Sequence, residues 1–214
     1  MSANVDLFWS FRSPYSYLAM PGALALEKDF KVKVSFRPVL PLAVRDPTFF
    51  SPDNLKRAKY IRFDWVRRAE MLGVPHAWPS PDPIVQDLET YEIAKEQPYI
   101  YRLTYLGVEA ERRGFGMAFA YEVSRLIFGG TRDWHLGDHL KQAAGRAGLD
   151  LAALDAAIAD PTSQRPVVEE NQDALAKSGH WGVPTFVFEG EPFFGEDRIG
   201  TLRWRLSKKG LQRS

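Results

Sequence analysis

The chain has 214 residues, of which 45% are hydrophobic and 26% are charged, with a formal net charge of +1. This composition is typical of a globular protein of one or two domains, and the near-neutral charge gives no support for nucleic acid as the main partner. The sequence contains no cysteine, which excludes disulfides, thiol catalysis by the protein and cysteine metal sites. No apolar run approaches the roughly 20 residues that span a bilayer. The N-terminal residues also lack the pattern of a secretory signal, so we predict a cytoplasmic protein without a membrane partner.

The N-terminal segment predicts a βαβ unit. Residues 4–10 alternate apolar and polar side chains and contain aromatic residues, which is typical of a strand. Residues 15–29 have the apolar spacing of a helix, and residues 31–37 alternate as a second strand. Because a crossover helix joins the two strands, we expect them to run parallel.

A long series of helical patterns follows a proline-rich connection. We predict helices over residues 55–72, 88–96, 99–113, 117–128, 136–147, 151–159 and 165–178. Residues 184–188 and 192–194 then have the composition of two short strands. The turn between them is too short for a crossover, so we expect an antiparallel hairpin, followed by a last helix over 197–209.

The order of these elements predicts one α/β domain with a helical insertion. The chain begins with β-α-β and ends with α-β-β-α, which is the order of the thioredoxin-like fold. We assign residues 1–45 and 165–214 to the thioredoxin-like domain. Residues 46–164 are predicted to form the large all-helical inserted domain.

The corner at Ser13 is the first candidate functional feature. It follows the first predicted strand and precedes Pro14, a residue that suits the first position of a helix. The backbone N–H groups at a helix start have no partner within the helix, and the helix dipole favours an anion there. The same residues also fit a helix cap by Ser13 with no ligand.

A pair of histidines gives a weaker signal. His135 and His139 are four residues apart, and on a helix they would share one face, which is the spacing of a metal-binding pair. Asp138 lies beside the pair, but Leu136 stands where the zinc-protease motif has its glutamate, and a histidine pair near a helix start is more often involved in capping or packing. We therefore predict no metal site.

Three short motifs, taken together and in this order, resemble those of one family. It is the glutathione-using branch of the DsbA-like thioredoxin superfamily, which contains the 2-hydroxychromene-2-carboxylate isomerases and the kappa-class glutathione transferases. The resemblance covers nearly the whole chain, includes the stretch from Lys59 to Asp64, and implies a thioredoxin-like fold and a homodimer. The motifs are Ser13-Pro14-Tyr15-Ser16, Gly182-Val183-Pro184-Thr185 and Phe194-Gly195-Glu196-Asp197-Arg198.

The resemblance gives the serine corner a chemical role. In thiol–disulfide members of the superfamily this corner is Cys-Pro-x-Cys, and here Ser13 and Ser16 occupy both cysteine positions. A hydroxyl does not exchange disulfides, so ordinary redox activity is excluded. A free thiol has a pKa of about 8.5 and is mostly protonated at neutral pH. The family likeness implies that Ser13 is the catalytic residue, which stabilises the thiolate of bound glutathione through its hydroxyl.

The other two motifs are expected to hold glutathione. The resemblance makes Val183 and Pro184 a cis-proline loop whose backbone pairs with the cysteinyl part of glutathione. It places the γ-glutamyl end at Glu196, Asp197 and Arg198, with Glu196 the weaker assignment because related enzymes mostly carry a smaller polar residue there. Without the resemblance, Pro184 would simply begin a strand and the two acids would favour a helix start.

The expected reaction is a glutathione-dependent isomerisation of a small aromatic substrate. The family chemistry converts a hemiketal of the 2-hydroxychromene-2-carboxylate type to trans-o-hydroxybenzylidenepyruvate. Tyr15, Lys59, Tyr60 and Arg62 are the candidates for the substrate pocket. Two alternatives stay open: a kappa-like glutathione transferase that conjugates an electrophile, and a non-catalytic thioredoxin-fold module that binds a peptide or a thiol.

Overall fold

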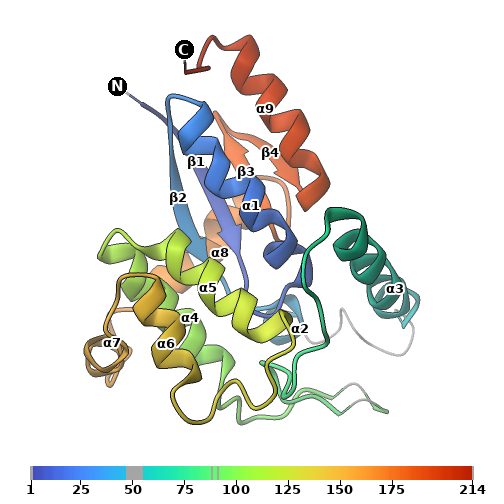
Figure 1. The fold of residues 1–214 in the computed structure, drawn as a ribbon, viewed down its shortest axis with the longest axis vertical. Coiled ribbons are helices and arrows are strands. Elements are labelled where there is room, and N and C mark those ends of the chain that lie inside the picture. The colour runs from blue at the N-terminus through green and yellow to red at the C-terminus, as the bar shows by residue number, and fades with distance from the viewer. Residues whose placement is uncertain (1, 47–54, 88, 91, 214) are drawn as a thin grey trace.

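A single four-stranded sheet lies at the centre of the fold (Figure 1). The computed structural model describes residues 2–46, 55–87, 89, 90 and 92–213. The strand order is β2-β1-β3-β4. The strands are β1 (Ala3–Trp9), β2 (Val32–Pro38), β3 (Thr185–Phe188) and β4 (Glu191–Phe194).

The pairing of the strands confirms the predicted thioredoxin-like topology. β1 and β2 are parallel, with Val5 opposite Val34, and α1 (Pro14–Asp29) crosses between them. β3 is antiparallel to β1, and β4 is antiparallel to β3. The predicted strands agree with the observed ones to within a residue or so at each end. β1 is buried on both faces, because Leu7 and Phe8 point to opposite sides and both are inaccessible to solvent.

Helices cover both faces of the sheet and extend beyond one end of it (Figure 1). Phe8 packs with Leu175 of α8 (Arg165–Lys177) on one face, whereas α1 and α9 (Ile199–Lys208) lie on the other. The other helical segments of the described residues are α2 (Leu42–Arg45), α3 (Leu55–Leu72), α4 (Ile100–Arg112), α5 (Gly116–Phe128), α6 (His139–Arg146), α7 (Leu151–Ala157) and η3 (Glu196–Arg198).

One apolar core joins the sheet to the inserted helices. The same cluster contains Leu7 of β1, Leu103 of α4, Phe119 of α5 and Trp65 of α3. The division into two domains at residues 46 and 164 stays a prediction. Among the residues that the structure describes, no helix is long and apolar enough to cross a membrane.

The predicted helix over 88–96 is wrong. None of the described residues in this range is helical, and an isolated bridge between Gln86 and Ile93 makes the segment a turn. The reason is local hydrogen bonding: the Asp87 side chain accepts the N–H groups of Glu89 and Thr90 at 2.7 Å each. Such a turn offers the backbone an alternative to a helix.

Two further helices differ from the prediction. The helix expected from residue 136 begins instead at His139, because Gly137 has a φ of 55°, which a helix does not allow. His135 therefore lies outside α6, and the helical spacing that suggested a metal pair does not apply. The short helix α2 lies in a segment that we expected to be irregular.

α1 and α9 approach each other closely at Gly22. α1 continues as a helix through Pro21. A Cβ atom on Gly22 would lie 2.8 Å from Cδ1 of Ile199, the first residue of α9, so the Ile199 side chain would have to shift to accept a larger residue. The glycine thus permits a close contact between α1 and α9.

Candidate active site

The Ser13 corner has the geometry of a capped helix start. α1 begins at Pro14, and the Ser13 Oγ atom accepts the N–H of Ser16 at 3.1 Å, which confirms Ser13 as the N-cap. The same hydroxyl donates a hydrogen bond to the carbonyl oxygen of Val183 at 3.3 Å. Two motifs that are 170 positions apart in the sequence therefore meet at Ser13.

The loop before β3 has the form that the resemblance implied. The Val183–Pro184 peptide bond is cis. The Pro184 carbonyl accepts the N–H of Gly195 at 2.9 Å, which ties this loop to the start of η3. Within the described part of the chain, the N–H of Val183 has no backbone or side-chain acceptor. All three sequence motifs are thus joined by direct hydrogen bonds, with a free backbone donor beside Ser13.

The acidic residues at the start of η3 lie in different environments. Glu196 is only 8% exposed, and its carboxylate pairs with Arg68 of α3 at 2.5 Å. Asp197 and Arg198 are exposed and lie 3.6 Å apart at their charged ends. Gly195 has a φ of 105°, and a Cβ atom there would come within 2.6 Å of Oδ1 of Asp197. The backbone at this turn therefore requires glycine.

Of the four predicted pocket residues, two meet at one carboxylate. The Tyr15 hydroxyl donates to Asp64 at 2.8 Å, and the Tyr60 hydroxyl donates to the same side chain at 3.2 Å. Lys59 and Arg62 are exposed, and their side chains make no hydrogen bond or ion pair within the part of the chain that is described.

Asp64 is the centre of a polar cluster next to the corner. Arg67 also binds it, with Nη2 2.5 Å from Oδ1. Partial burial opposes ionisation of Asp64, but the hydrogen bonds from Tyr15, Arg67 and Tyr60 hold the pKa of its carboxyl below the ordinary value. Burial, followed by the hydrogen bond to Asp64, raises the pKa of Tyr15 far above that of a free tyrosine. Asp64 is therefore an anion and Tyr15 a neutral donor at neutral pH.

Further contacts attach the corner to the segment after α3. The Arg12 guanidinium binds both oxygens of Asp82, at 3.0 and 3.1 Å. The Tyr17 hydroxyl donates to the carbonyl of Pro75 at 2.7 Å. The inserted helical part is thus held directly at the residues on either side of Ser13.

Sequence reasoning missed Asp64, Arg68 and Asp82 as partners of the site. The sequence held a usable signal for Asp64 and Arg68, because residues four apart in a helix share one face of it, here of α3. Asp82 had none, since it lies in a proline-rich loop.

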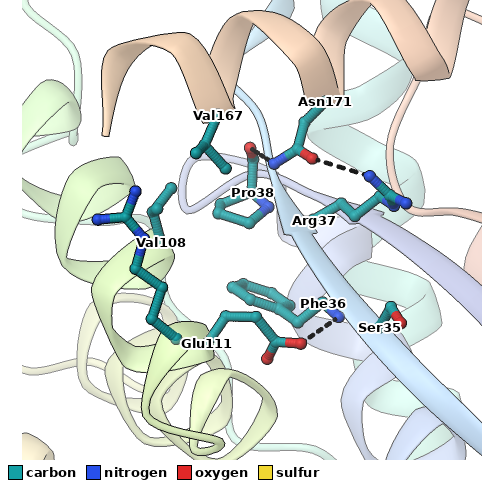
Figure 2. Close-up of a pocket in the computed structure, with 9 residues that line it drawn as sticks. Ser35, Phe36, Arg37, Pro38, Val108, Glu111, Val167 and Asn171 are labelled. Carbon is teal, nitrogen blue, oxygen red and sulfur yellow. Dashed lines mark hydrogen bonds between the residues drawn. The ribbon is translucent and has the colours of Figure 1, made fainter. Parts of the chain in front are cut away.

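A separate hollow lies at the outer edge of β2 (Figure 2). It has a volume of about 240 Å³, and none of the predicted site residues lines it. Glu111 accepts the outward N–H of Phe36 at 3.2 Å, and Asn171 donates to the carbonyl of Pro38 at 3.0 Å. These two side chains thus provide partners for the Phe36 N–H and the Pro38 carbonyl on the open edge of β2.

The described residues do not assemble a metal centre. No group of three or more His, Cys, Asp or Glu side chains in this part of the chain is placed to hold an ion. The His135 ring instead packs against Tyr99, with 4.8 Å between the ring centroids.

The fold and the corner together define a thioredoxin-fold protein whose corner carries two serines in place of the redox cysteines. The chain belongs to the DsbA-like thioredoxin domain family, whose model matches residues 4–207. A hydroxyl and a free backbone N–H at this corner can stabilise an anion but cannot exchange a disulfide.

The chain is also similar to individual named proteins. The chain is 22% identical over 208 residues to the 2-hydroxychromene-2-carboxylate isomerase of Pseudomonas putida, with 95% of this chain and 94% of that protein covered. A solved structure of a 2-hydroxychromene-2-carboxylate isomerase superposes with a TM-score of 0.70 at 21% identity, covering 96% of this chain and 95% of that one. The cytosolic disulfide reductase DsbM of Pseudomonas aeruginosa, solved with GSH, superposes with a TM-score of 0.58 at 16% identity, covering 95% and 99%.

Proposed function

We propose that the protein is a glutathione-dependent isomerase that acts on an aromatic-catabolite hemiketal of the 2-hydroxychromene-2-carboxylate type and forms trans-o-hydroxybenzylidenepyruvate. The observation that carries the proposal is the contact of the Ser13 hydroxyl with Val183, at a corner that has no thiol of its own. The names of the matched isomerases support the reaction. Bound glutathione would supply a thiolate nucleophile that is released unchanged, so no oxidant or reductant is needed.

The residues of the corner fit a thiolate. The Ser13 hydroxyl now donates through a long bond of 3.3 Å to a carbonyl, and a sulfur anion would be the stronger acceptor. The start of α1 adds the favourable end of a helix dipole. The free N–H of Val183 would pair with the cysteinyl carbonyl of glutathione, beside Pro184.

The remaining predicted residues have roles in the same proposal. Asp197 would pair with the γ-glutamyl ammonium group and Arg198 with the carboxylate of that group, since both side chains are exposed. The aromatic substrate would lie beside α3, with Tyr15 and Tyr60 as its walls. Lys59 and Arg62 supply exposed cations for its carboxylate.

We also propose a cytoplasmic homodimer. The lack of cysteine fits a reducing compartment. α3 exposes apolar side chains, with Phe63 at 74%, and a second copy of the chain would cover them. Sedimentation equilibrium tests the dimer: Phe63→Asp should yield monomers, and a wild-type protein that is monomeric at micromolar concentration would contradict the proposal.

Calorimetry and product analysis test the catalytic proposal. Glutathione should bind, and one equivalent should convert many equivalents of substrate while its concentration stays constant. A kappa-like transferase would instead consume glutathione stoichiometrically. No binding at millimolar glutathione would reject both enzymes and favour a non-catalytic binding module.

The role of Ser13 has its own measurement. The pH titration of thiolate absorbance in the glutathione complex should shift upward in Ser13→Ala. Loss of a hydrogen bond to a charged group costs about 1.5–3 kcal/mol, which corresponds to roughly 1–2 units in the thiol pKa. An unchanged titration would remove Ser13 from the mechanism.

A further inference from the structure

Glu196 is a buried acid at the position where the proposed function places the γ-glutamyl end of glutathione. Its side chain is 7% exposed, at the first position of η3. A buried carboxylate is strongly unfavourable unless a cation or several donors compensate its charge. A second carboxylate at this place, from the γ-glutamyl group, would also be repelled by an uncompensated Glu196.

Arg68 supplies the compensating charge from a different part of the chain. Its Nε atom lies 2.5 Å from Oε1 of Glu196, and its side chain is 26% exposed. The hydrogen bond to Glu196, and the charges of Asp197 and Asp64, raise the pKa of the Arg68 guanidinium. Arg68 is thus a permanent cation that is paired with Glu196.

The position of Arg68 on α3 connects the two ends of the proposed site. Asp64 and Arg68 are four residues apart, so they lie on one face of the helix. Asp64 binds Tyr15, two residues after Ser13, and Arg68 binds Glu196. In Figure 1, α3 lies beside the start of α1 and the start of α9.

We propose that Arg68 is a positioning residue of the thiol-cofactor site, which neutralises Glu196 and so allows the carboxylate of a γ-glutamyl group to bind at the start of α9. This inference rests on the proposed function, because it assigns that end of glutathione to η3. Arg68 acts through Glu196 and need not touch the ligand.

S-methylglutathione is the probe that separates this role from thiol activation, because its sulfur cannot ionise. Arg68→Gln should weaken its binding by at least about tenfold, the effect of losing one charge-assisted interaction. Glu196→Gln should bind as tightly as the wild type or more tightly, since no charge remains to be neutralised. Arg68→Lys, which keeps the charge, should stay within about threefold of the wild type.

The double variant Arg68→Gln/Glu196→Gln decides between charge and structure. Neutralisation predicts that it recovers binding to within about threefold of the wild type. A purely structural role of Arg68 predicts that binding stays weak, and this outcome would overturn the inference. If Arg68→Gln does not fold, the double variant can still be compared with Arg68→Lys. Weak binding by the double variant, with near-wild-type binding by Arg68→Lys, would overturn the inference.

The outcomes for the two proposals are distinct. Equal binding by Arg68→Gln and the wild type overturns the role of Arg68 and leaves the glutathione site intact. Wild-type binding of S-methylglutathione with no lowering of the glutathione thiol pKa overturns the thiolate mechanism and leaves the role of Arg68 intact. Failure of the wild type to bind either compound overturns both.

Discussion

Replacing Ser13 by alanine removes two hydrogen bonds that hold the corner, and the cost can be worked from their geometry. The Oγ atom caps α1 by accepting the Ser16 N–H at 3.1 Å, and it donates to Val183 at 3.3 Å. Loss of an N-cap costs about 1 kcal/mol. The bond to Val183 is longer than a normal hydroxyl hydrogen bond and should add no more than about 0.5–1 kcal/mol. We expect Ser13→Ala to lower the free energy of unfolding by about 1–2 kcal/mol.

The matched control is the second serine of the corner. Ser16 is fully buried, and its Oγ atom has no hydrogen-bond partner within the described residues. Ser16→Ala removes this unpaired hydroxyl and leaves the capped N–H in place, so stability should be unchanged or should rise by up to about 1 kcal/mol.

Urea unfolding without ligand measures both variants. In a chain of this size, each kcal/mol also corresponds to roughly 2–4 °C in Tm. The reasoning is refuted if Ser13→Ala is no less stable than Ser16→Ala, because the two serines would then be equivalent in the folded protein. The comparison tests the corner itself and does not depend on any ligand.

Three other substitutions test the packing and the sheet edge. Gly107→Ala would place a Cβ atom 2.8 Å from the Phe11 ring, so the free energy of unfolding should fall by about 1–3 kcal/mol. In the control Gly145→Ala, the new Cβ atom meets nothing within 4 Å, and the free energy of unfolding should rise by about 0.5–1 kcal/mol. A loss of stability in both variants would contradict the packing argument. Burial raises the pKa of Glu111, which accepts the Phe36 N–H. Stability should therefore fall as pH rises from the ordinary carboxyl pKa through the raised one. Glu111→Gln should not show this loss of stability with rising pH. The measurement compares urea midpoints at about pH 4 and about pH 8 in the wild type and in Glu111→Gln; an equal change in the two proteins would contradict the role of Glu111.

The strands and most helices could be predicted because their apolar spacing is regular. β2 alternates along its length, and α4 has apolar residues on one face. The failure at residues 88–96 has a different origin. Apolar spacing there resembles a helix, but Asp87 and Gln97 bind the backbone with their side chains and stabilise a turn. Competition of this kind depends on side-chain geometry and not on hydrophobic pattern.

The candidate site was predictable where it is built from strand ends and helix starts. Ser13 and Val183 meet because β1 and β3 are neighbours in the sheet, which follows from the topology. The partner of Glu196 was not predictable, because Arg68 lies 128 positions away and their contact depends on how α3 packs against α9. Pattern and motif define elements and their order, whereas the packing of an inserted helix requires the three-dimensional structure.

The polar contacts around the corner attach α3 and the segment after it to the start of α1. Arg12, Tyr15 and Tyr17 flank Ser13, and each binds a residue of the segment 64–82 through a hydrogen bond or ion pair. Such partly exposed contacts contribute about 1 kcal/mol or less each, much less than the burial of Trp65 and its neighbours. They therefore add little to stability compared with the core. Their main effect is to fix the orientation of α3 relative to Ser13; in the proposed function, a ligand at the corner would then contact both parts of the chain at once.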